Sequence, residues 1–187
     1  MPPTLDEMLA ATRDRLRSLR TRRRDLERRA ESAPAPIRFA SAFGGDRVAL
    51  IAEVKRRSPS AGVIRNDLRP AERAETYARV GARAVSVLTD GPFFGGSMDD
   101  LAGVVARVAV PVLRKDFILD EIQILEARAA GAAAVLLIVR ALPPARLRAL
   151  LEFAGQSGLE ALVEVHAPGE LDAALGAGAR VVGVNSR

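Results

Sequence analysis

The sequence has no cysteine, no tryptophan and a single histidine, His166. The lack of cysteine excludes disulfides, thiolate zinc sites and a cysteine nucleophile. One histidine argues against a histidine-built metal site and against a Ser-His-Asp triad. We therefore expect chemistry without a bound metal, carried by other side chains.

Long apolar runs are also missing. No stretch reaches the roughly 18 apolar residues that a membrane-spanning helix needs, and the first residues contain no apolar signal-peptide region. With 187 residues, of which 49% are hydrophobic and 27% charged, the chain can build one sizeable core and has a globular composition. We therefore expect a cytoplasmic protein without a membrane partner.

Lysine is nearly absent, although the chain is rich in positive charge. Only Lys55 and Lys115 are lysines among the 28 basic residues, and each follows an apolar run. A lysine ammonium can give up a proton when its environment lowers its pKa, whereas an arginine guanidinium stays charged. The two lysines are therefore candidates for proton transfer, Schiff-base chemistry or phosphate binding, and their placement favours such a role over chance.

The amino-terminal segment carries much of the net charge of +5, with nine arginines and six acidic residues in the first 31 positions. A single helix is predicted over residues 4–31, because Thr4 and Glu7 have capping-box spacing. Its apolar stripe consists of Leu5, Met8, Leu9, Leu16 and Leu19. No aromatic residue lies among the arginines, so we expect a solvated helix face and no nucleic-acid partner. Residues 32–36 predict a stiff linker, and residues 1–47 a helical extension.

From Val48 onward the sequence repeats a unit of strand and helix. A glycine followed by small and β-branched residues occurs three times, 50 and 47 residues apart, in Gly81–Val87, Gly131–Leu137 and Gly178–Val184. Three further runs have the character of buried parallel strands: Val48–Val54, Val110–Leu113 and Leu159–Val165. Six strands alternating with five helices favour an α/β (β/α)8 TIM barrel, and no Gly-x-Gly-x-x-Gly supports a doubly wound sheet. We therefore expect residues 48–187 to form a partial barrel with strands 1 to 6.

Polar residues follow the apolar runs at intervals of two. In a barrel, alternate strand residues point inward, and active sites lie at the carboxyl ends of the strands. The residues in such positions are Glu53 with Lys55, Lys115 with Phe117, Glu164 with His166, and Asn185 with Arg187. We expect them to converge on one rim, because buried charges are costly unless they are paired or used. The alternative is that some point outward or form structural salt bridges.

Five segments at these strand ends form an ordered series. They are Ile51-Ala-Glu-Val-Lys-Arg-Arg-Ser-Pro-Ser60, Ser86-Val-Leu-Thr-Asp90 with Phe93-Phe-Gly-Gly-Ser97, Pro111-Val-Leu-Arg-Lys-Asp-Phe117, Leu162-Val-Glu-Val165 and Gly183-Val-Asn-Ser-Arg187. In this order they resemble the motifs of the indole-3-glycerol phosphate synthase family. The resemblance implies a TIM barrel with an amino-terminal helical extension.

The resemblance also implies a reaction of tryptophan biosynthesis. A small phosphorylated substrate, 1-(2-carboxyphenylamino)-1-deoxyribulose 5-phosphate, is closed to indole-3-glycerol phosphate with loss of carbon dioxide and water. By similarity, Lys115 is the general acid of ring closure, paired with Glu53. Glu164 resembles the carboxylate of the dehydration, with Lys55 as its acid partner or as a phosphate contact. The division of roles among Lys55, Glu53 and Glu164 stays open, and no cofactor is implied.

By the same resemblance, five residues hold the substrate. Phe94 and Phe117 would line its anthranilate ring, although both also suit ordinary core packing. Ser58, Asn185 and Arg187 would hold its polar parts, and Arg187 suits a carboxylate.

The family's barrel has two βα units more than the six strands counted here, and their loops are a common phosphate grip. We therefore expect residues 1–187 alone to be an inactive, C-terminally truncated form that self-associates through open strand edges. Three other functions stay open: a related barrel such as phosphoribosylanthranilate isomerase, a Schiff-base aldolase with Lys115 as nucleophile, and a fragment without activity.

Overall fold

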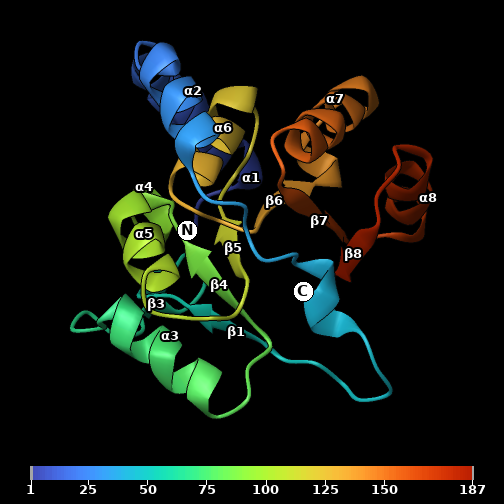
Figure 1. Ribbon diagram of the computed structural model, residues 1–187. Helices are drawn as coiled ribbons and strands as arrows, with labels where there is room; N and C mark the ends of the chain where they lie inside the picture. Colours follow the sequence, from blue (N-terminus) through green and yellow to red (C-terminus); the bar gives the residue numbers. More distant parts are fainter. Residues whose placement is uncertain (1, 187) are drawn as a thin grey trace.

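A computed structural model describes residues 2–186 of the chain (Figure 1). Its centre is a curled sheet of six parallel strands in the order β1-β4-β5-β6-β7-β8. The strands are β1 (Ile51–Val54), β4 (Ala84–Leu88), β5 (Val112–Lys115), β6 (Ala134–Ile138), β7 (Glu160–Val165) and β8 (Val181–Val184). The order of these six strands in the sheet is the same as their order along the chain, as in a succession of βα units. The predicted α/β fold with six parallel strands is confirmed.

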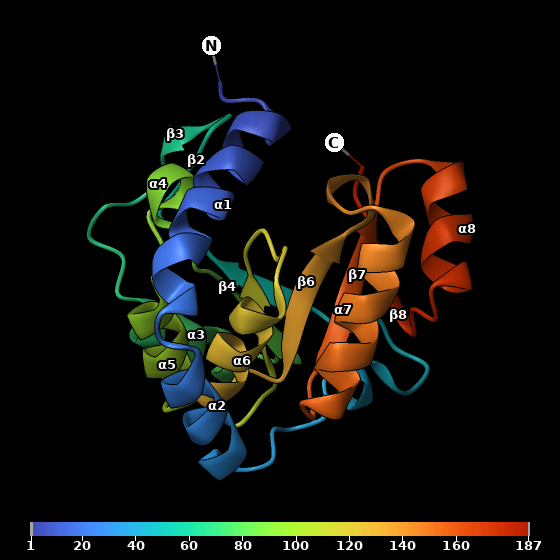
Figure 2. The ribbon, with the colours of Figure 1, turned by 90° about the horizontal axis from the view of Figure 1, so that it is seen from above.

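Helices connect the strands, and the longer ones cover one face of the sheet (Figures 1 and 2). They are α3 (Pro70–Arg79), α4 (Gly91–Phe94), α5 (Met98–Val105), α6 (Glu121–Ala129), α7 (Pro144–Gln156) and α8 (Pro168–Gly176). The smaller elements are the 3-10 turns η1 (Ala40–Phe43) and η2 (Val139–Ala141) and the hairpin strands β2 (Arg57–Ser58) and β3 (Gly62–Val63). Within residues 2–186, no helix has the length and apolarity to cross a membrane.

Alternate residues of each strand face two different environments. On β7, Val163 and Val165 are buried in the main core with residues of the surrounding helices, whereas Glu164 faces a cleft on the inner side. Near the amino ends of the strands, the inner side is filled by an apolar cluster around Phe39 and Leu113. Phe39 is fully buried, and burial of such a ring contributes about 1.5–3 kcal/mol. The inner face is therefore apolar at one end and polar at the other.

The first strand begins later than predicted. β1 pairs with β4 from Ile51 opposite Ala84, whereas Val48, the predicted start, is fully exposed. An apolar run alone cannot show where a partner strand begins. Strand pairing, and not apolarity, therefore sets the start of β1.

The glycine that opens each repeat lies where a helix ends and the next strand approaches. The backbone φ is +104° at Gly81, +82° at Gly131 and +95° at Gly178. Side chains of L-residues rarely adopt this left-handed conformation, which glycine adopts freely. The repeated glycine thus marks the turn from each helix toward its strand.

The amino-terminal segment forms two helices where the sequence predicts one. The first, α1, spans Leu5–Arg20, and the second, α2, spans Arg23–Ser32. The predicted capping box is present, since the amide of Glu7 donates to the Thr4 hydroxyl and the amide of Thr4 donates to the Glu7 carboxylate. At the break, the Thr21 hydroxyl donates to a carbonyl of the last turn of α1 at 2.7 Å. No glycine or proline marks this break in the sequence.

The apolar stripe of α1 packs this helix against the rest of the chain. Leu9 is buried in a cluster with Phe117, Leu136 and Ile138, near the carboxyl ends of β5 and β6. Leu16 is buried farther along the helix, in a cluster with residues of α2 and α6. Figure 2 shows α1 beside α4 and α6. The arginine-rich helix is therefore solvated on one side only.

A buried ion network lies between β5 and α6. The Arg114 side chain is 4% exposed and pairs with Asp116 at 3.0 Å and with Glu126 at 2.9 Å. It also donates to the Thr89 hydroxyl at 3.1 Å and to the carbonyl of Gln123 at 2.7 Å. All three nitrogens of the guanidinium thus have partners, which is the condition under which a buried charge is tolerated.

Asp116 lies at the centre of this network and its side chain is fully buried. It also accepts hydrogen bonds from Arg15 at 3.1 Å and from the Thr89 hydroxyl at 2.8 Å. Burial raises the pKa of Asp116, but the charges of Arg114 and Arg15 and the bond from Thr89 outweigh it, so the pKa lies below its ordinary value of 3.8. The ionised Asp116 carboxylate therefore stabilises the fold in full above pH 3.8, the ordinary pKa of an aspartate. This stabilisation is lost as the pH falls through the lowered pKa of the folded state.

Asp116→Asn should lower the free energy of unfolding at pH 7 by about 3 kcal/mol, because it removes a counter-charge of buried Arg114. The difference from the unaltered chain should shrink as the pH falls below 3.8, since protonation removes the same charge. Urea unfolding at pH 7 and at pH 3 measures both effects. The control Asp67→Asn removes an exposed carboxylate paired with Arg65 and should change little at either pH. Equal stability of Asp116→Asn and the unaltered chain at pH 7 would contradict the account.

Candidate active site

A cleft of about 200 Å³ opens at the carboxyl ends of the parallel strands. Its walls combine the inward-facing strand-end residues with residues of the loops that follow. They are Glu53, Lys55, Leu88, Asp90, Phe94, Lys115, Asp116, Phe117, Leu136, Ile138, Glu164 and Asn185. The parallel register aligns them, since Leu88 pairs with Lys115 and Ile138 pairs with Glu164. The structure thus brings most of the predicted site residues together.

A second and larger cavity, of about 510 Å³, lies at the opposite end of β7 and β8. Its walls include Glu160 and Val181, the first residues of β7 and β8, and neither lysine of the chain. Active sites of parallel barrels lie at the carboxyl ends of the strands. The smaller cleft is therefore the candidate site.

Glu53 contacts both lysines of the chain. Lys55 Nζ lies 2.6 Å from Glu53 Oε1, and Lys115 Nζ lies 3.3 Å from Glu53 Oε2. Lys115 Nζ lies a further 3.9 Å from Glu164 Oε2. The Glu53, Lys55 and Lys115 side chains are about one-third exposed or less. One carboxylate thus joins the ends of β1 and β5, and Lys115 stands between two carboxylates.

The charge state of Glu53 follows from these contacts. Burial raises the pKa of Glu53, but the hydrogen bond from Lys55 and the charge of Lys115 outweigh it, so the pKa lies below its ordinary value of 4.5. Glu53 is therefore an ionised acceptor near neutral pH. The proton donors beside it are the two ammonium groups, each with three N–H bonds.

Glu164 is held on both sides of its carboxylate. Its side chain is 14% exposed, and Oε1 accepts a hydrogen bond from Asn185 Nδ2 at 3.2 Å. His166 Nε2 lies 3.5 Å from the same oxygen and His166 Nδ1 lies 3.6 Å from Glu170. The other oxygen, Oε2, faces Lys115. Within residues 2–186, no group of three or more acidic or histidine side chains is placed to hold a metal ion.

Two aromatic rings form the apolar wall of the cleft. The ring centroids of Phe94 and Phe117 are 6.3 Å apart and the ring planes are inclined by 48°. Phe117 is buried and follows β5, whereas Phe94 is half-buried on the short helix α4. The wall therefore combines two strand ends, with β4 leading into α4 and β5 leading into Phe117.

The turn that carries Phe94 depends on a close backbone approach. Asp90 caps α4, and its Oδ1 accepts from the amides of Phe93 at 2.7 Å and Phe94 at 3.3 Å. After α4 the chain returns to β4, where a Cβ on Gly96 would lie 2.0 Å from the carbonyl oxygen of Leu88. Only glycine fits there, so the Phe-Phe-Gly-Gly motif fixes where the Phe94 ring lies.

One predicted substrate-binding residue, Ser58, is not among the described residues that line the cleft. Ser58 lies on β2, where its hydroxyl accepts a hydrogen bond from the amide of Ala61 at 3.2 Å. The hairpin is tied to the start of α4, since Arg57 donates to the carbonyl of Gly91 at 3.0 Å. Arg187 lies outside the described residues.

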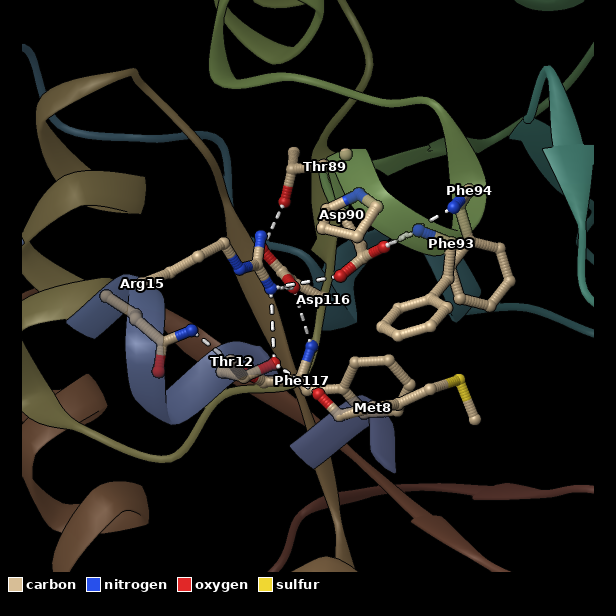
Figure 3. Close-up of polar contacts among 12 residues, drawn as sticks. Met8, Thr12, Arg15, Thr89, Asp90, Phe93, Phe94, Asp116 and Phe117 are labelled. Atoms are coloured by element: carbon tan, nitrogen blue, oxygen red, sulfur yellow. Dashed lines mark hydrogen bonds and ion pairs between the residues drawn. The ribbon is translucent and has the colours of Figure 1, made fainter. Parts of the chain in front are cut away.

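Three charged residues at the cleft have no role in the sequence prediction. Asp90 and Asp116 line it, and Arg15 Nη2 lies 3.0 Å from an Asp90 oxygen and 3.1 Å from an Asp116 oxygen (Figure 3). The position of Asp90 before Gly-Pro is a recognisable helix-cap signal. The partners of Arg15 are 75 and 101 residues away in the sequence, so no local pattern could identify them.

Comparison with known proteins points to the family that the motifs resemble. The family model described as indole-3-glycerol phosphate synthase matches residues 5–187. Indole-3-glycerol phosphate synthase 2 of Streptomyces coelicolor is 56% identical over 173 residues, which cover 92% of this chain and 67% of the relative. The enzyme of that family name from Leptospira interrogans is 55% identical over 138 residues, which cover 74% of this chain and 55% of the relative.

A third relative matches nearly the whole chain. The indole-3-glycerol phosphate synthase of Chloroherpeton thalassium is 47% identical over 189 residues, which cover 98% of this chain and 73% of the relative. The chain thus spans between 55% and 73% of the length of these three relatives.

Solved structures share the fold at low sequence identity. The carboxyl transferase domain of Rhizobium etli pyruvate carboxylase with 3-bromopyruvate has a TM-score of 0.57 and 10% identity, over 79% of this chain and 32% of that chain. Another structure of this domain has a TM-score of 0.55 and 14% identity, over 74% and 27% of the two chains. These similarities concern the fold alone.

Family membership therefore has two independent grounds. The family model covers all but the first four residues, and relatives with about half of their residues identical carry one family name. The ordered strand-end motifs agree with this family, since they place Glu53, Lys55, Lys115 and Glu164 on one rim. The chain belongs to the indole-3-glycerol phosphate synthase family.

Proposed function

We propose that this chain carries the acid–base residues of an indole-3-glycerol phosphate synthase, a carboxy-lyase of class EC 4.1.1.48. The substrate would be 1-(2-carboxyphenylamino)-1-deoxyribulose 5-phosphate and the product indole-3-glycerol phosphate. The observation that carries the proposal is the Lys115 ammonium, 3.3 Å from Glu53 and 3.9 Å from Glu164. Such a group can donate a proton at the mouth of a cleft with an aromatic wall.

Ring closure is the step assigned to Lys115. The ring carbon that bears the carboxylate attacks the ketone carbon of the sugar, and the ketone oxygen accepts a proton from Lys115. Glu53 stays ionised and serves as a counter-charge to both lysines, with Glu164 as a second carboxylate near Lys115. A guanidinium could balance charge in the same way but could not deliver this proton.

Decarboxylation and dehydration complete the reaction. Loss of carbon dioxide restores the benzenoid ring, and the new five-membered ring becomes aromatic once a hydroxyl leaves as water and a proton is removed. Glu164 is the proposed base of that last step, oriented by the hydrogen bond from Asn185. Lys55 is either the acid that assists the leaving hydroxyl or a contact of the substrate phosphate.

Three substrate contacts are proposed from their place in the cleft: Phe94 and Phe117 for the anthranilate ring and Asn185 for a polar part of the substrate. Ser58 and Arg187 are proposed for other polar parts by family resemblance alone. A cytoplasmic location, the division into a helical extension with linker over residues 1–47 and a partial barrel over residues 48–187, and self-association through the outer edges of β1 and β8 stay predictions.

The activity is tested by indole fluorescence after addition of the substrate. The assay uses the chain alone and the chain completed with the part of the Streptomyces relative that it does not cover. Formation of indole-3-glycerol phosphate supports the proposal. Borohydride trapping of a ketose phosphate on Lys115 would instead identify an aldolase, because only a Schiff base is reduced in this way.

Lys115→Arg should lower kcat by more than tenfold, a cost above about 1.4 kcal/mol in the transition state, because the guanidinium keeps the charge but holds its proton. Lys55→Arg is the matched control and should retain more activity if Lys55 contacts phosphate. The kcat of each variant is measured by indole fluorescence and compared with that of the same protein without the substitution. A Lys115→Arg variant that retains more than about a tenth of kcat would mean that the acid lies elsewhere.

Glu164→Gln should lower kcat by about 100-fold or more with little change in KM, because the amide keeps the shape but cannot take up a proton. Glu160→Gln is a matched control on the same inner face of β7, at the opposite end of the strand. It should leave both constants near those of the parent. An effect of Glu164→Gln on KM alone would show that Glu164 only binds the substrate.

A further inference from the structure

Each aromatic ring of the cleft is held through its backbone by a different carboxylate. The amide of Phe94 donates to Asp90 Oδ1 at 3.3 Å, and the amide of Phe117 donates to Asp116 Oδ1 at 2.9 Å. The Asp90 and Asp116 side chains are 1% and 0% exposed. The positions of the two rings therefore depend on where two buried carboxylates lie.

A single nitrogen of Arg15 joins these carboxylates. Nη2 lies 3.0 Å from Asp90 Oδ2 and 3.1 Å from Asp116 Oδ1 (Figure 3). The same nitrogen is 3.2 Å from the Thr12 hydroxyl, which itself donates to the carbonyl of Met8. Two buried, ionised carboxylates repel each other strongly unless a cation lies between them. Arg15 therefore determines how closely the two carboxylates approach.

The ionisation of Asp90 is the weak point of this arrangement. Burial raises the pKa of Asp90, and although the Phe93 amide and the Arg15 charge act against it, the pKa stays above its ordinary value. Loss of the Arg15 charge would leave Asp90 beside Asp116 with less compensation. Asp90 would then protonate or move, and α4 would lose the acceptor that caps it.

We propose that Arg15 is a positioning residue for substrate recognition. By clamping Asp90 to Asp116 it sets the separation of the Phe94 and Phe117 rings, now 6.3 Å between centroids, and thereby the affinity for the aromatic half of the substrate. This inference rests on the proposed function, because that function assigns the anthranilate ring to these two phenylalanines. Arg15 itself touches neither the reacting atoms nor the lysines.

A second ion pair of the same helix separates this role from general docking of α1. Arg20 Nη2 lies 2.6 Å from Asp120, whose side chain caps α6. This pair also ties α1 to the rest of the chain but contacts neither aromatic ring nor its carboxylate. If Arg15 acted only by docking α1, loss of Arg20 should have a comparable effect.

The test compares Arg15→Gln and Arg20→Gln in the full 187-residue chain. Affinity is measured for 2-aminobenzoate, through its own fluorescence, and for ribose 5-phosphate, which lacks the ring. Arg15→Gln should weaken 2-aminobenzoate binding by about tenfold, or 1.4 kcal/mol, and leave ribose 5-phosphate binding unchanged. Arg20→Gln should alter neither. Equal effects of the two variants, or equal loss of both probes, would overturn the proposal.

A second variant covers the case in which Arg15→Gln does not fold. Arg15→Lys keeps a compensating charge for the buried carboxylates, but the lysine nitrogen is one bond closer to the backbone than Arg15 Nη2, the atom that makes both contacts. It should therefore weaken 2-aminobenzoate binding by at least threefold. An affinity equal to that of the unaltered chain would overturn the clamp.

Amide hydrogen exchange distinguishes failure of the clamp from failure of the proposed function. In the Arg15 variants, and not in Arg20→Gln, exchange should accelerate at the amides of Phe93, Phe94 and Phe117. Suppose that the unaltered chain does not bind 2-aminobenzoate but the Arg15 variants show this faster exchange. The clamp then exists, and the assignment of the anthranilate ring to Phe94 and Phe117 is wrong. Unchanged exchange at all three amides would overturn the clamp whatever the chain binds.

Discussion

One carboxylate, that of Glu53, holds both lysines of the chain, and the polar half of the cleft is arranged around it. Lys55 and Lys115 approach different oxygens of this carboxylate at 2.6 and 3.3 Å. Partly buried charges of one sign repel each other unless a counter-charge lies between them. Glu53 supplies that counter-charge and leaves Lys115 close to Glu164 as well. A proton donor is thereby kept beside two acceptors, which is the arrangement that acid–base chemistry requires.

This arrangement follows from the parallel sheet. Every strand ends on the same side, and residues two apart on a strand share a face. Glu53, Lys115 and Glu164 come from three strands, and the two carboxylates lie 3.3 and 3.9 Å from Lys115 Nζ. The residues of opposite parity beside Lys115 are used differently, since Arg114 and Asp116 are buried and pair with each other at 3.0 Å. The charges beside Lys115 therefore stabilise the strand end that carries it.

The sequence predicted the six strands from a repeated glycine and from apolar, β-branched runs. It predicted the rim residues because successive side chains of a strand alternate between two faces. It did not predict the break after Arg20, since no glycine or proline marks it. The ion pairs of Arg15 with Asp90 and Asp116 were also not predicted. These carboxylates are 75 and 101 residues away in the sequence, and no local sequence pattern connects them with an arginine on a helix that was expected to face solvent. Ser58 was expected at the substrate but lies on a hairpin outside the residues that line the cleft.

The fold and the site carry different kinds of information. Pyruvate carboxylase domains share the arrangement of strands at 10–14% identity, and such similarity does not transfer an activity. The family assignment rests on sequence, and the proposed chemistry rests on side chains at the strand ends. Within the cleft, the polar wall depends on Glu53 and the aromatic wall on two buried aspartates. The two walls meet at the carboxyl end of β5, where Lys115 is followed directly by Asp116 and Phe117.

The central claim, that Glu53 bridges both lysines, can be measured directly because the chain has only two lysines. Lysine labelled with carbon-13 at the ε position gives one methylene signal for each. Glu53→Gln should shift both signals at pH 7, whereas Glu164→Gln should shift only that of Lys115. If Glu53→Gln leaves either lysine signal unchanged, Glu53 does not join the two lysines and the account of the cleft is wrong.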